Sequence, residues 1–490
     1  MRFLLDTNVL IPLEDSQRPL EPSLTSFVHL AHKHGHKLLF HPASVDDIRE
    51  DKDVQRRNQT LQRLKRYELL DARPVCPWNV NVVRLNDSRD NEILYALSLN
   101  AANGLVTEDR GIHDAAKVRG ISNRVYTIQT ANDLLLRLHR QAALTLPNVT
   151  EVPLFSLTPQ LGSAFFDSLR DGYPEFDKWF GKKAQAGARA WISSDEIGRV
   201  GAICIFDCQT RERITDELVL SGVALKLATF KVGASQRGRK IGELFLKAAF
   251  RHATEHRLEQ IFIHGDVDKH HFLFDLLVDF GFENVGSHPG SNGRDAVYLK
   301  QHPVVPPALD TSFLEYHRKY FPHFFSGPEV AKFVVPIRPE FHRILFPDYQ
   351  SVADHQAEMF PVDNYAGNAI KMAYLSHAQT NAIEPGGILL FYRSRDDQAL
   401  TSIGIVESYE QLSDADAIVE KVKRRTVYTL SEIQKKALKP TRVLLFRFVR
   451  HLIRPIPYAE LIKHRILNGP PQSLTPISQE AFQSAIAIGG

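Results

Sequence analysis

The feature that most restricts the fold of this chain is the alternation of short apolar runs with helical patterns in its first 141 residues. The predicted strands are residues 2–6, 37–42 and 105–109, and the predicted helices are residues 22–36 and 91–104. Gly104 stands where a left-handed residue would end the second helix. Strands separated by helices predict βαβ units, and hence a parallel sheet.

Two further segments follow, and each is bounded by prolines. Residues 150–302 contain a predicted strand hairpin, a longer strand, a glycine-containing loop and an amphipathic helix. Residues 308–485 contain several strands and few long helices, which indicates a β-barrel-like domain. We therefore expect a multidomain protein of mixed α/β and α+β class, with domains at residues 1–143, 150–302 and 308–485.

Composition narrows the class of protein. Of 490 residues, 43% are hydrophobic and 24% charged, which is ordinary for a globular protein. Three cysteines without a paired framework favour a reducing compartment, so we expect a cytoplasmic location. Cys204 and Cys208 lie in an apolar run and are expected in the core. No apolar stretch approaches the roughly 20 residues of a membrane span, so no membrane partner is expected.

Acidic residues recur at the ends of the predicted strands and at one helix start. They are Asp6, Asp47, Asp90 and Asp109. Residues just beyond the carboxyl ends of parallel strands converge on one sheet edge. Each acid alone is explained by a turn or a helix start, but four together predict a site for Mg²⁺ or Mn²⁺, ions that prefer oxygen ligands.

The first 140 residues or so resemble the PIN-domain nucleases. The stretches that carry the resemblance are LLDTNVLI, the acid before Ile48, DNEILYAL and LVTEDRGI. The resemblance implies metal-dependent cleavage of RNA, with Asp6, Asp47, Asp90 and Asp109 as catalytic metal ligands. It implies Asn8 and Thr107 as supporting groups. Three further acids stay open as alternative ligands: Asp46, Glu50 and Glu92.

A loop in the second segment joins a strand to a helix, as phosphate-binding loops do. The segment resembles the GNAT acetyltransferases along its whole length. The resemblance implies acetyl-CoA bound through its pyrophosphate by Val232, Arg237, Gly238, Arg239, Lys240, Ile241 and Gly242. Lys240 stands where glycine is usual in that family.

The same resemblance raises a question about turnover. Many members carry a tyrosine four residues before the glycine that corresponds to Gly281, as a general acid for the leaving thiolate. This chain has Leu277 there. Another acid could substitute, and four polar residues lie nearby in sequence, none with an assigned role: His264, Asp266, His270 and His271.

The third segment is basic. From Lys421 to the end the chain has 13 Lys or Arg against 3 Glu or Asp. Such a stretch either binds phosphates or is a solvated surface, and Tyr428, Phe446 and Phe448 are candidates to stack on bases. Several strands of the segment, among them GGILLFYRS and SIGIVES, resemble the PUA-like superfamily, especially its ASCH and EVE branches. That resemblance implies RNA binding.

Together these features predict a ribonuclease that also binds acetyl-CoA and RNA, either tRNA or mRNA. A toxin-like role with an antitoxin-like partner, or a role in RNA processing, stays open, as does a homodimer. One alternative is an N-acetyltransferase that acts on aminoacyl-tRNA or protein, with the flanking domains docking RNA. Another is a non-enzymatic RNA-binding regulator.

Overall fold

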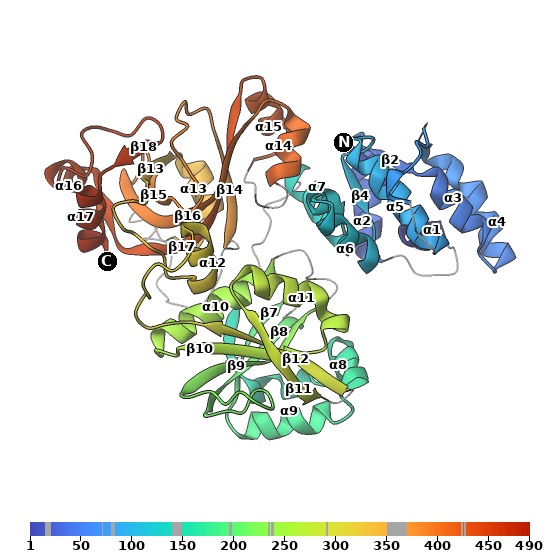
Figure 1. Cartoon of the computed structure of the whole chain (residues 1–490), viewed down its shortest axis with the longest axis horizontal. Coiled ribbons are helices and arrows are strands. Elements are labelled where there is room, and N and C mark those ends of the chain that lie inside the picture. The colour runs from blue at the N-terminus through green and yellow to red at the C-terminus, as the bar shows by residue number, and fades with distance from the viewer. Residues whose placement is uncertain are drawn as a thin grey trace. The chain divides into compact units, whose positions relative to one another are not determined.

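A computed structural model (Figure 1) describes most of the chain. The described residues are 1–14, 21–70, 72–79, 84–139, 149–195, 198–233, 236, 240–290, 293–349, 370–422, 425 and 428–490. They form two compact units. The first comprises Met1–Leu144 and Leu412–Thr441, and the second Thr145–Gln411 and Arg442–Gly490.

The first unit is built on a five-stranded sheet in the order β3-β2-β1-β4-β5, and every described pair in it is parallel. Its strands are β1 (Arg2–Leu5), β2 (Lys37–Phe40), β3 (Glu68–Leu69), β4 (Gly104–Val106) and β5 (Val125–Tyr126). Its helices are α1 (Thr7–Glu14), α2 (Pro22–Lys33), α3 (Pro42–Arg49), α4 (Val54–Arg63), α5 (Leu85–Ser98), α6 (Arg110–Val118) and α7 (Ile128–His139). The predicted parallel sheet is therefore found.

Helices cover both faces of this sheet. Side chains from α3, α5 and α6 pack with alternate residues of the strands, such as Leu4 and Leu105, in one buried cluster. On the other face Phe3 contacts Phe27 of α2 edge to face, with ring centroids 5.4 Å apart. This three-layer arrangement follows from strands that are apolar on both faces.

A helical hairpin from far along the chain completes the first unit. It consists of α14 (Ala415–Val422) and α15 (Leu430–Ala437). Glu420 accepts a hydrogen bond from Asn123 at 2.8 Å and lies 3.4 Å from Arg124, while Asp416 accepts one from Asn103 at 3.0 Å. These partners precede β4 and β5, so α14 lies at the amino ends of the strands.

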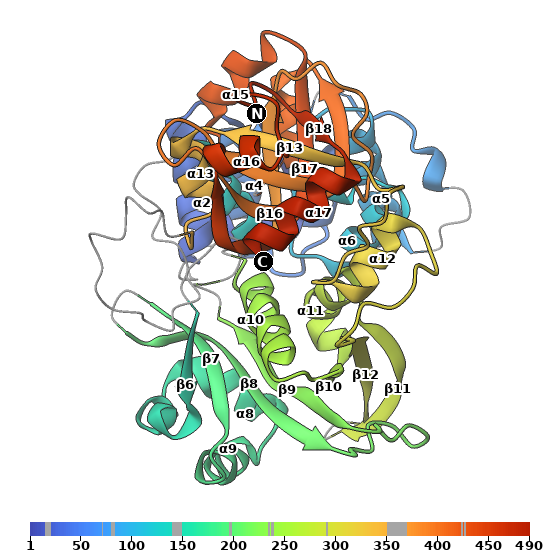
Figure 2. The ribbon, with the colours of Figure 1, turned by 90° about the vertical axis from the view of Figure 1, so that its left-hand side faces the viewer.

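The second unit contains a seven-stranded sheet in the order β11-β12-β10-β9-β8-β7-β6. Its strands are β6 (Thr150–Pro153), β7 (Arg189–Ser194), β8 (Val200–Thr210), β9 (Val223–Val232), β10 (Gln260–Gly265), β11 (Glu283–Gly290) and β12 (Gly293–Gln301). Only β9 and β10 form a parallel pair among the described strands; the other described pairs are antiparallel. Figure 2 shows this sheet from a second side.

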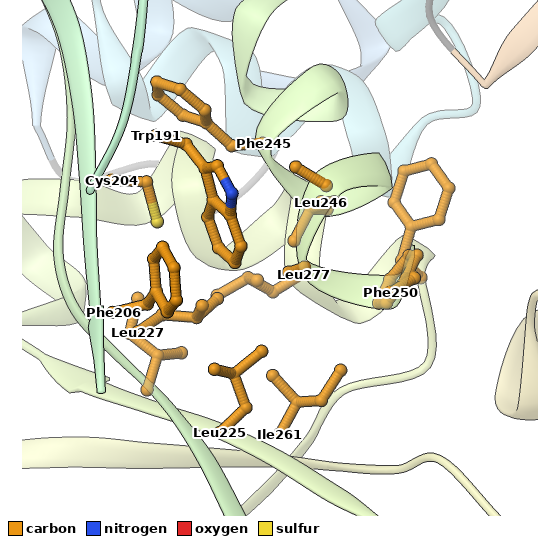
Figure 3. Packing of buried hydrophobic residues seen from close by; sticks show 14 of the residues in the cluster. Trp191, Cys204, Phe206, Leu225, Leu227, Phe245, Leu246, Phe250, Ile261 and Leu277 are labelled. Atoms are coloured by element: carbon orange, nitrogen blue, oxygen red, sulfur yellow. The ribbon is translucent and has the colours of Figure 1, made fainter. Parts of the chain in front are cut away.

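Two pairs of helices cover opposite faces of this sheet (Figure 1). They are α10 (Ile241–Glu255) with α11 (Val267–Asp279), and α8 (Asp167–Gly172) with α9 (Phe176–Gln185). Under α10 and α11, Trp191 stacks on Phe206 at 3.8 Å between ring centroids, and Leu277 is fully buried beside them (Figure 3). Cys204 is buried there as predicted, whereas Cys208 is exposed.

The remaining residues of the second unit form a six-stranded sheet in the order β14-β17-β16-β15-β13-β18. Its strands are β13 (Lys332–Ile337), β14 (Lys371–Ser376), β15 (Ile388–Arg393), β16 (Ala399–Leu412), β17 (Thr441–Pro457) and β18 (Thr475–Ile477). Its helices are α12 (Phe313–Tyr320), α13 (Pro339–Leu345), α16 (Tyr458–Lys463) and α17 (Gln479–Gly489).

The predicted closed barrel is not found among the described strands. β14 and β18 are the two edges of the sheet, and β18 has only three residues, all paired with β13. The prediction that three aromatic side chains of this segment are accessible for stacking on bases is also wrong. Tyr428, Phe446 and Phe448 are each 2% exposed or less, so they belong to the apolar core.

Paired charges join α11 to this third sheet. Arg447 is fully buried and donates to Glu407 at 2.7 Å and to the Asp279 carboxylate at 3.1 Å. Lys371 forms an ion pair with Asp279 and lies over the Phe280 ring. Because a buried charge is costly unless it is paired, each cation here needs its acid.

No described helix is long and apolar enough to cross a membrane.

Candidate functional sites

The first candidate site is the carboxyl edge of the parallel sheet in the first unit. Asp6 directly follows β1 and is 5% exposed. One of its carboxylate oxygens accepts from the Thr7 N–H at 2.7 Å, and the other accepts from the Thr107 hydroxyl at 2.7 Å. Thr107 follows β4, so its hydroxyl links the ends of two neighbouring strands.

The other predicted acids approach the same edge from three helices. Asp109 caps the amino end of α6 by accepting from the Ile112 N–H at 3.1 Å. Asp47 lies in α3 and accepts from the Thr7 hydroxyl at 3.3 Å. Asp90 lies inside α5 and not at its start, because that helix begins five residues earlier, at Leu85.

The electrostatics show that these acids share one neighbourhood. Burial raises the pKa of Asp6 to about 6, with smaller contributions from Asp109 and Asp47. Burial also raises the pKa of Asp90 to about 7, and the charges of Asp6, Asp109 and Asp47 raise it further. The carboxylates therefore repel one another, which is the condition that a cation relieves.

The acids do not form a ready coordination sphere. Within the described part of the chain, no three His, Cys, Asp or Glu side chains stand close enough to hold one metal ion. This arrangement therefore does not support a metal ion at the four carboxylates, and their role as metal ligands stays a prediction. The physical reason is that the carboxylates repel one another, and that Asp6, Asp47 and Asp109 already accept hydrogen bonds from protein donors.

Two arginines that the sequence analysis missed form ion pairs with the acids that were open as alternative metal ligands. Arg89 is buried and donates to Asp47 at 2.6 Å and to both oxygens of Glu50, at 2.8 and 2.6 Å. Arg73 bridges Asp46 and Glu92, donating to each at 2.6 Å. Arg89 stands directly before Asp90 in the sequence, but a single sequence does not show that its guanidinium turns back to α3.

The second candidate site lies where β9 and β10 separate. The two strands pair only through Ala224–Gln260, Leu225–Ile261 and Lys226–Phe262. Beyond that point β9 continues to pair with β8, and β10 pairs with β12. The facing backbone groups of the two strands are thus unpaired with each other beyond Lys226 and Phe262 in the described pairing.

The end of β9 and the start of α10 lie at this opening. Arg237, Gly238 and Arg239 lie outside the described residues. Val232 ends β9, and Ile241 is buried in the core under α10. Only backbone groups of Ile241 could therefore face a ligand. A Cβ at Gly242 would lie 2.9 Å from the Leu276 side chain, so this glycine permits close packing of α10 on α11.

The Lys240 side chain has a partner that the sequence did not reveal, and its place in the pyrophosphate-binding loop stays a prediction. Its φ of 59° lies in the left-handed region, which explains why glycine suits this position. Its amine donates to the carbonyl of Lys371 at 3.0 Å. The side chain therefore ties the start of α10 to β14, a strand of the third sheet, and does not stand ready for a phosphate.

Polar groups gather at the same opening, on the face away from α10 and α11. His264 of β10 has its Nδ1 3.5 Å from Asp295 of β12, and its ring contacts that of His288 of β11 at 5.5 Å between centroids. The sequence pointed to His264 without a partner. Asp295 is 31 residues away and only the sheet brings the two together.

No protein-family model and no curated protein match this sequence. Among solved structures, similar parts include the ASCH protein of Zymomonas mobilis, which is 16% identical over 32% of this chain and 96% of its own (TM-score 0.26). They also include aminoglycoside 6'-acetyltransferase type Ii, 18% identical over 33% of this chain and 99% of its own (TM-score 0.24). Arabidopsis thaliana NAA60, solved with a bisubstrate analogue, is 14% identical over 31% of this chain and 95% of its own (TM-score 0.25).

Proposed function

We propose that residues 150–302 bind acetyl-CoA and transfer its acetyl group to an acceptor. The observation that carries this proposal is the opening between β9 and β10 after Lys226 and Phe262. Buried backbone N–H and C=O groups need partners, and the pantetheine arm of acetyl-CoA offers two amides in an extended chain. The start of α10, a 15-residue helix, stands at the same end and suits a pyrophosphate.

The absence of tyrosine at position 277 does not decide against transfer. Leu277 points into the core under α11 and is fully buried (Figure 3). A tyrosine there would have to place its hydroxyl among apolar side chains, so position 277 is not open to a thiolate in this fold.

Binding is tested by calorimetric titration with acetyl-CoA. Gly242→Glu places a carboxylate in the first turn of α10 and is expected to abolish binding. Gly242→Ala meets the same Leu276 contact without the charge, and is expected to bind within a few-fold of the parent. Gly181→Glu in α9, where a side chain meets open space, is the matched charge control. Equal binding by Gly242→Glu and the parent would contradict the proposal.

A second proposal concerns the first unit: cleavage of RNA that depends on a divalent cation at the carboxylate edge. It is supported by the raised pKa values of Asp6 and Asp90, which arise from burial and from mutual repulsion. Mg²⁺ or Mn²⁺, when bound, would activate water and neutralise charge on the phosphate. In this proposal Asp6, Asp47, Asp90 and Asp109 hold the ion, and the Thr107 hydroxyl orients Asp6.

The nuclease proposal is tested with total RNA and Mn²⁺, followed by sequencing of the new ends. Asp90→Asn is expected to remove the Mn²⁺-dependent ends. Asp87→Asn, an exposed acid one turn earlier on α5, is the control and should keep them. Identical ends from the parent and from Asp90→Asn would show that any cleavage arises elsewhere.

The third proposal is that the basic stretch contacts RNA, as the PUA-like resemblance implies. Lys423 and Arg424 lie outside the described residues, whereas Lys435 and Lys439 are exposed on and after α15. The joint change of these two lysines to Glu should weaken RNA binding and lower the slope of log K against log salt by about 0.7–0.9 for each lost phosphate contact. An unchanged slope would make the stretch ordinary surface. The antitoxin-like partner and the homodimer stay predictions.

A further inference from the structure

The acceptor side of the proposed acetyltransferase is defined by which way the β10 side chains point. Ile261 and Ile263 lie in the cluster under α10 and α11. Phe262 lies in a separate cluster with Val297 and Leu299 of β12. Because strand side chains alternate between faces, His264 shares the face of Phe262, opposite α10 and α11. It is the second residue beyond the last pair between β9 and β10.

His264 therefore stands at the opening, on the face from which an acceptor can approach a thioester held between the strands. Val297 is the cross-strand partner of His264, and Asp295 lies two residues from Val297 along β12, hence on the same face of the sheet. A carboxylate oxygen of Asp295 lies 3.5 Å from Nδ1 of His264, which is within ion-pair distance. This distance is long for a hydrogen bond, and catalytic hydrogen bonds often shorten when substrate binds.

We propose that His264 is the general base of acetyl transfer, that Asp295 positions its ring, and that the acceptor is a weakly basic amine such as an α-amino group. This inference rests on the acetyl transfer proposed above. With Nδ1–H directed at Asp295, the lone pair that can accept a proton is on Nε2.

The charges around His264 favour an acceptor that arrives neutral. Lys226 of β9 lies on the same face, over the Phe262 ring at 5.6 Å. Burial first, and then Lys226 and His288, lower the pKa of His264 to about 4, while Asp295 opposes them. Asp266 and His270 at the start of α11, and Tyr173 beside α8, are further titratable groups near this face. Glu212, Lys183 and Asp207 lie near Lys226.

The Lys226 ammonium on this face repels an acceptor that arrives positively charged, and a lysine amine, with a pKa of about 10.4, is an ammonium at neutral pH. An α-amino group, with a pKa of about 7.7–8.0, is substantially neutral at slightly basic pH. Such an amine needs no prior deprotonation. The amine needs a base only once its nitrogen has attacked the thioester, because the nitrogen then carries a positive charge and becomes acidic.

The step balances as follows. The neutral amine attacks the thioester carbonyl carbon, and the new C–N bond forms as the C=O electrons move to oxygen. The nitrogen, now positive, gives one proton to Nε2 of His264. The C–S bond breaks, the carbonyl re-forms, and the CoA thiolate takes that proton back from the imidazolium through solvent. The products are the N-acetyl amide and CoA thiol, so the step does not require a tyrosine at position 277.

The test uses the full chain and two matched acceptors. Nε-acetyl-lysinamide offers only an α-amine, and Nα-acetyl-lysinamide offers only an ε-amine. Release of CoA thiol is followed at pH 7–9, and acetyl-CoA affinity is measured separately by calorimetry. The α-amine is expected to be acetylated at least tenfold faster in kcat/KM than the ε-amine. Equal rates, or faster reaction of the ε-amine, would overturn the acceptor class.

Two variants test the residues. His264→Gln is expected to lower kcat by about 10²–10⁴-fold with acetyl-CoA affinity unchanged, whereas His256→Gln at the end of α10 serves as the control. Asp295→Asn should lower kcat more than it raises KM, Asp295→Glu should recover part of the loss, and Asp295→Asn should add nothing in the His264→Gln background.

The possible outcomes distinguish failure of this inference from failure of the proposed acetyl transfer. Acetyl-CoA binding and transfer with an unchanged kcat in His264→Gln would overturn the role of His264 and leave the proposed function intact. Binding without acetylation of either amine would overturn this inference alone. Failure of the parent protein to bind acetyl-CoA would overturn both.

Discussion

The buried Asp6 gives a prediction whose size follows from the structure. Burial raises its pKa from 3.8 to about 6, and one pKa unit corresponds to about 1.36 kcal/mol. The ionised form therefore costs the folded first unit up to about 3 kcal/mol. Between pH 4 and 6 the folded state binds more protons than the unfolded state, so stability falls as pH rises through this window and stays low above it.

Asp6→Asn should remove this fall because asparagine is neutral in both states. The amide keeps one oxygen acceptor where the carboxylate has two, for the Thr7 N–H and the Thr107 hydroxyl. Loss of one of these hydrogen bonds costs about 1 kcal/mol. The net expectation is a gain of about 1–2 kcal/mol at pH 8, or roughly 3–6 °C, and no gain at pH 4.

The assay is hydrogen exchange of peptides that cover β1 and β4, supported by melting curves at pH 4 and pH 8. Asp87→Asn is the control for a change of charge at the same edge of the molecule. Added Mg²⁺ should narrow the difference at pH 8 by stabilising the parent and not the variant. If Asp6→Asn is less protected than the parent at pH 8, the ionised Asp6 carboxylate does not carry the burial cost inferred for it.

Two other backbone positions give separate predictions. Lys240→Gly relieves the left-handed backbone strain but loses the hydrogen bond to Lys371, whereas Lys240→Ala loses the hydrogen bond and keeps the strain. The glycine variant should melt at the higher temperature, with a free energy of unfolding about 1 kcal/mol larger than that of the alanine variant. The reverse order of melting temperatures would refute the strain. Gly281 has φ 81°, and a Cβ there would lie 2.4 Å from the carbonyl oxygen of Arg318; Gly281→Ala should lower urea stability of the second unit by several kcal/mol, and a loss under 1 kcal/mol would show that α12 can move away.

The elements that the sequence predicted are those with a strong local signal. Leu4 and Leu5 lie in an apolar run followed by an acid, and β1 ends at Leu5, one residue before the predicted end. Element ends were less well predicted. The left-handed residue after α5 is Asn100, with φ 62°, while Gly104 opens β4, where a Cβ would lie 2.7 Å from the Tyr126 ring. Either residue suits a left-handed position, and only tertiary packing selects between them.

The pairs that decide the chemistry were out of reach of the sequence. Arg89 neutralises Asp47 across 42 residues, and Asp295 reaches His264 through the pairing of β10 with β12. The acids themselves could be predicted, because their positions after strands and in helices are local. Whether a neighbouring cation occupies them depends on side-chain directions that no local pattern contains.

The helical hairpin of α14 and α15 has a consequence for the order of synthesis. Leu412–Thr441 belongs to the first compact unit, yet it leaves the ribosome after nearly all of the second. Until then Arg124, which is 7% exposed in the finished chain, lacks its ion pair with Glu420. A fragment of residues 1–143 reproduces this earlier stage. The nascent chain therefore carries the acids of the carboxylate edge on an incomplete unit. The opposite side of the sheet is covered only after Leu412–Thr441 has been synthesised.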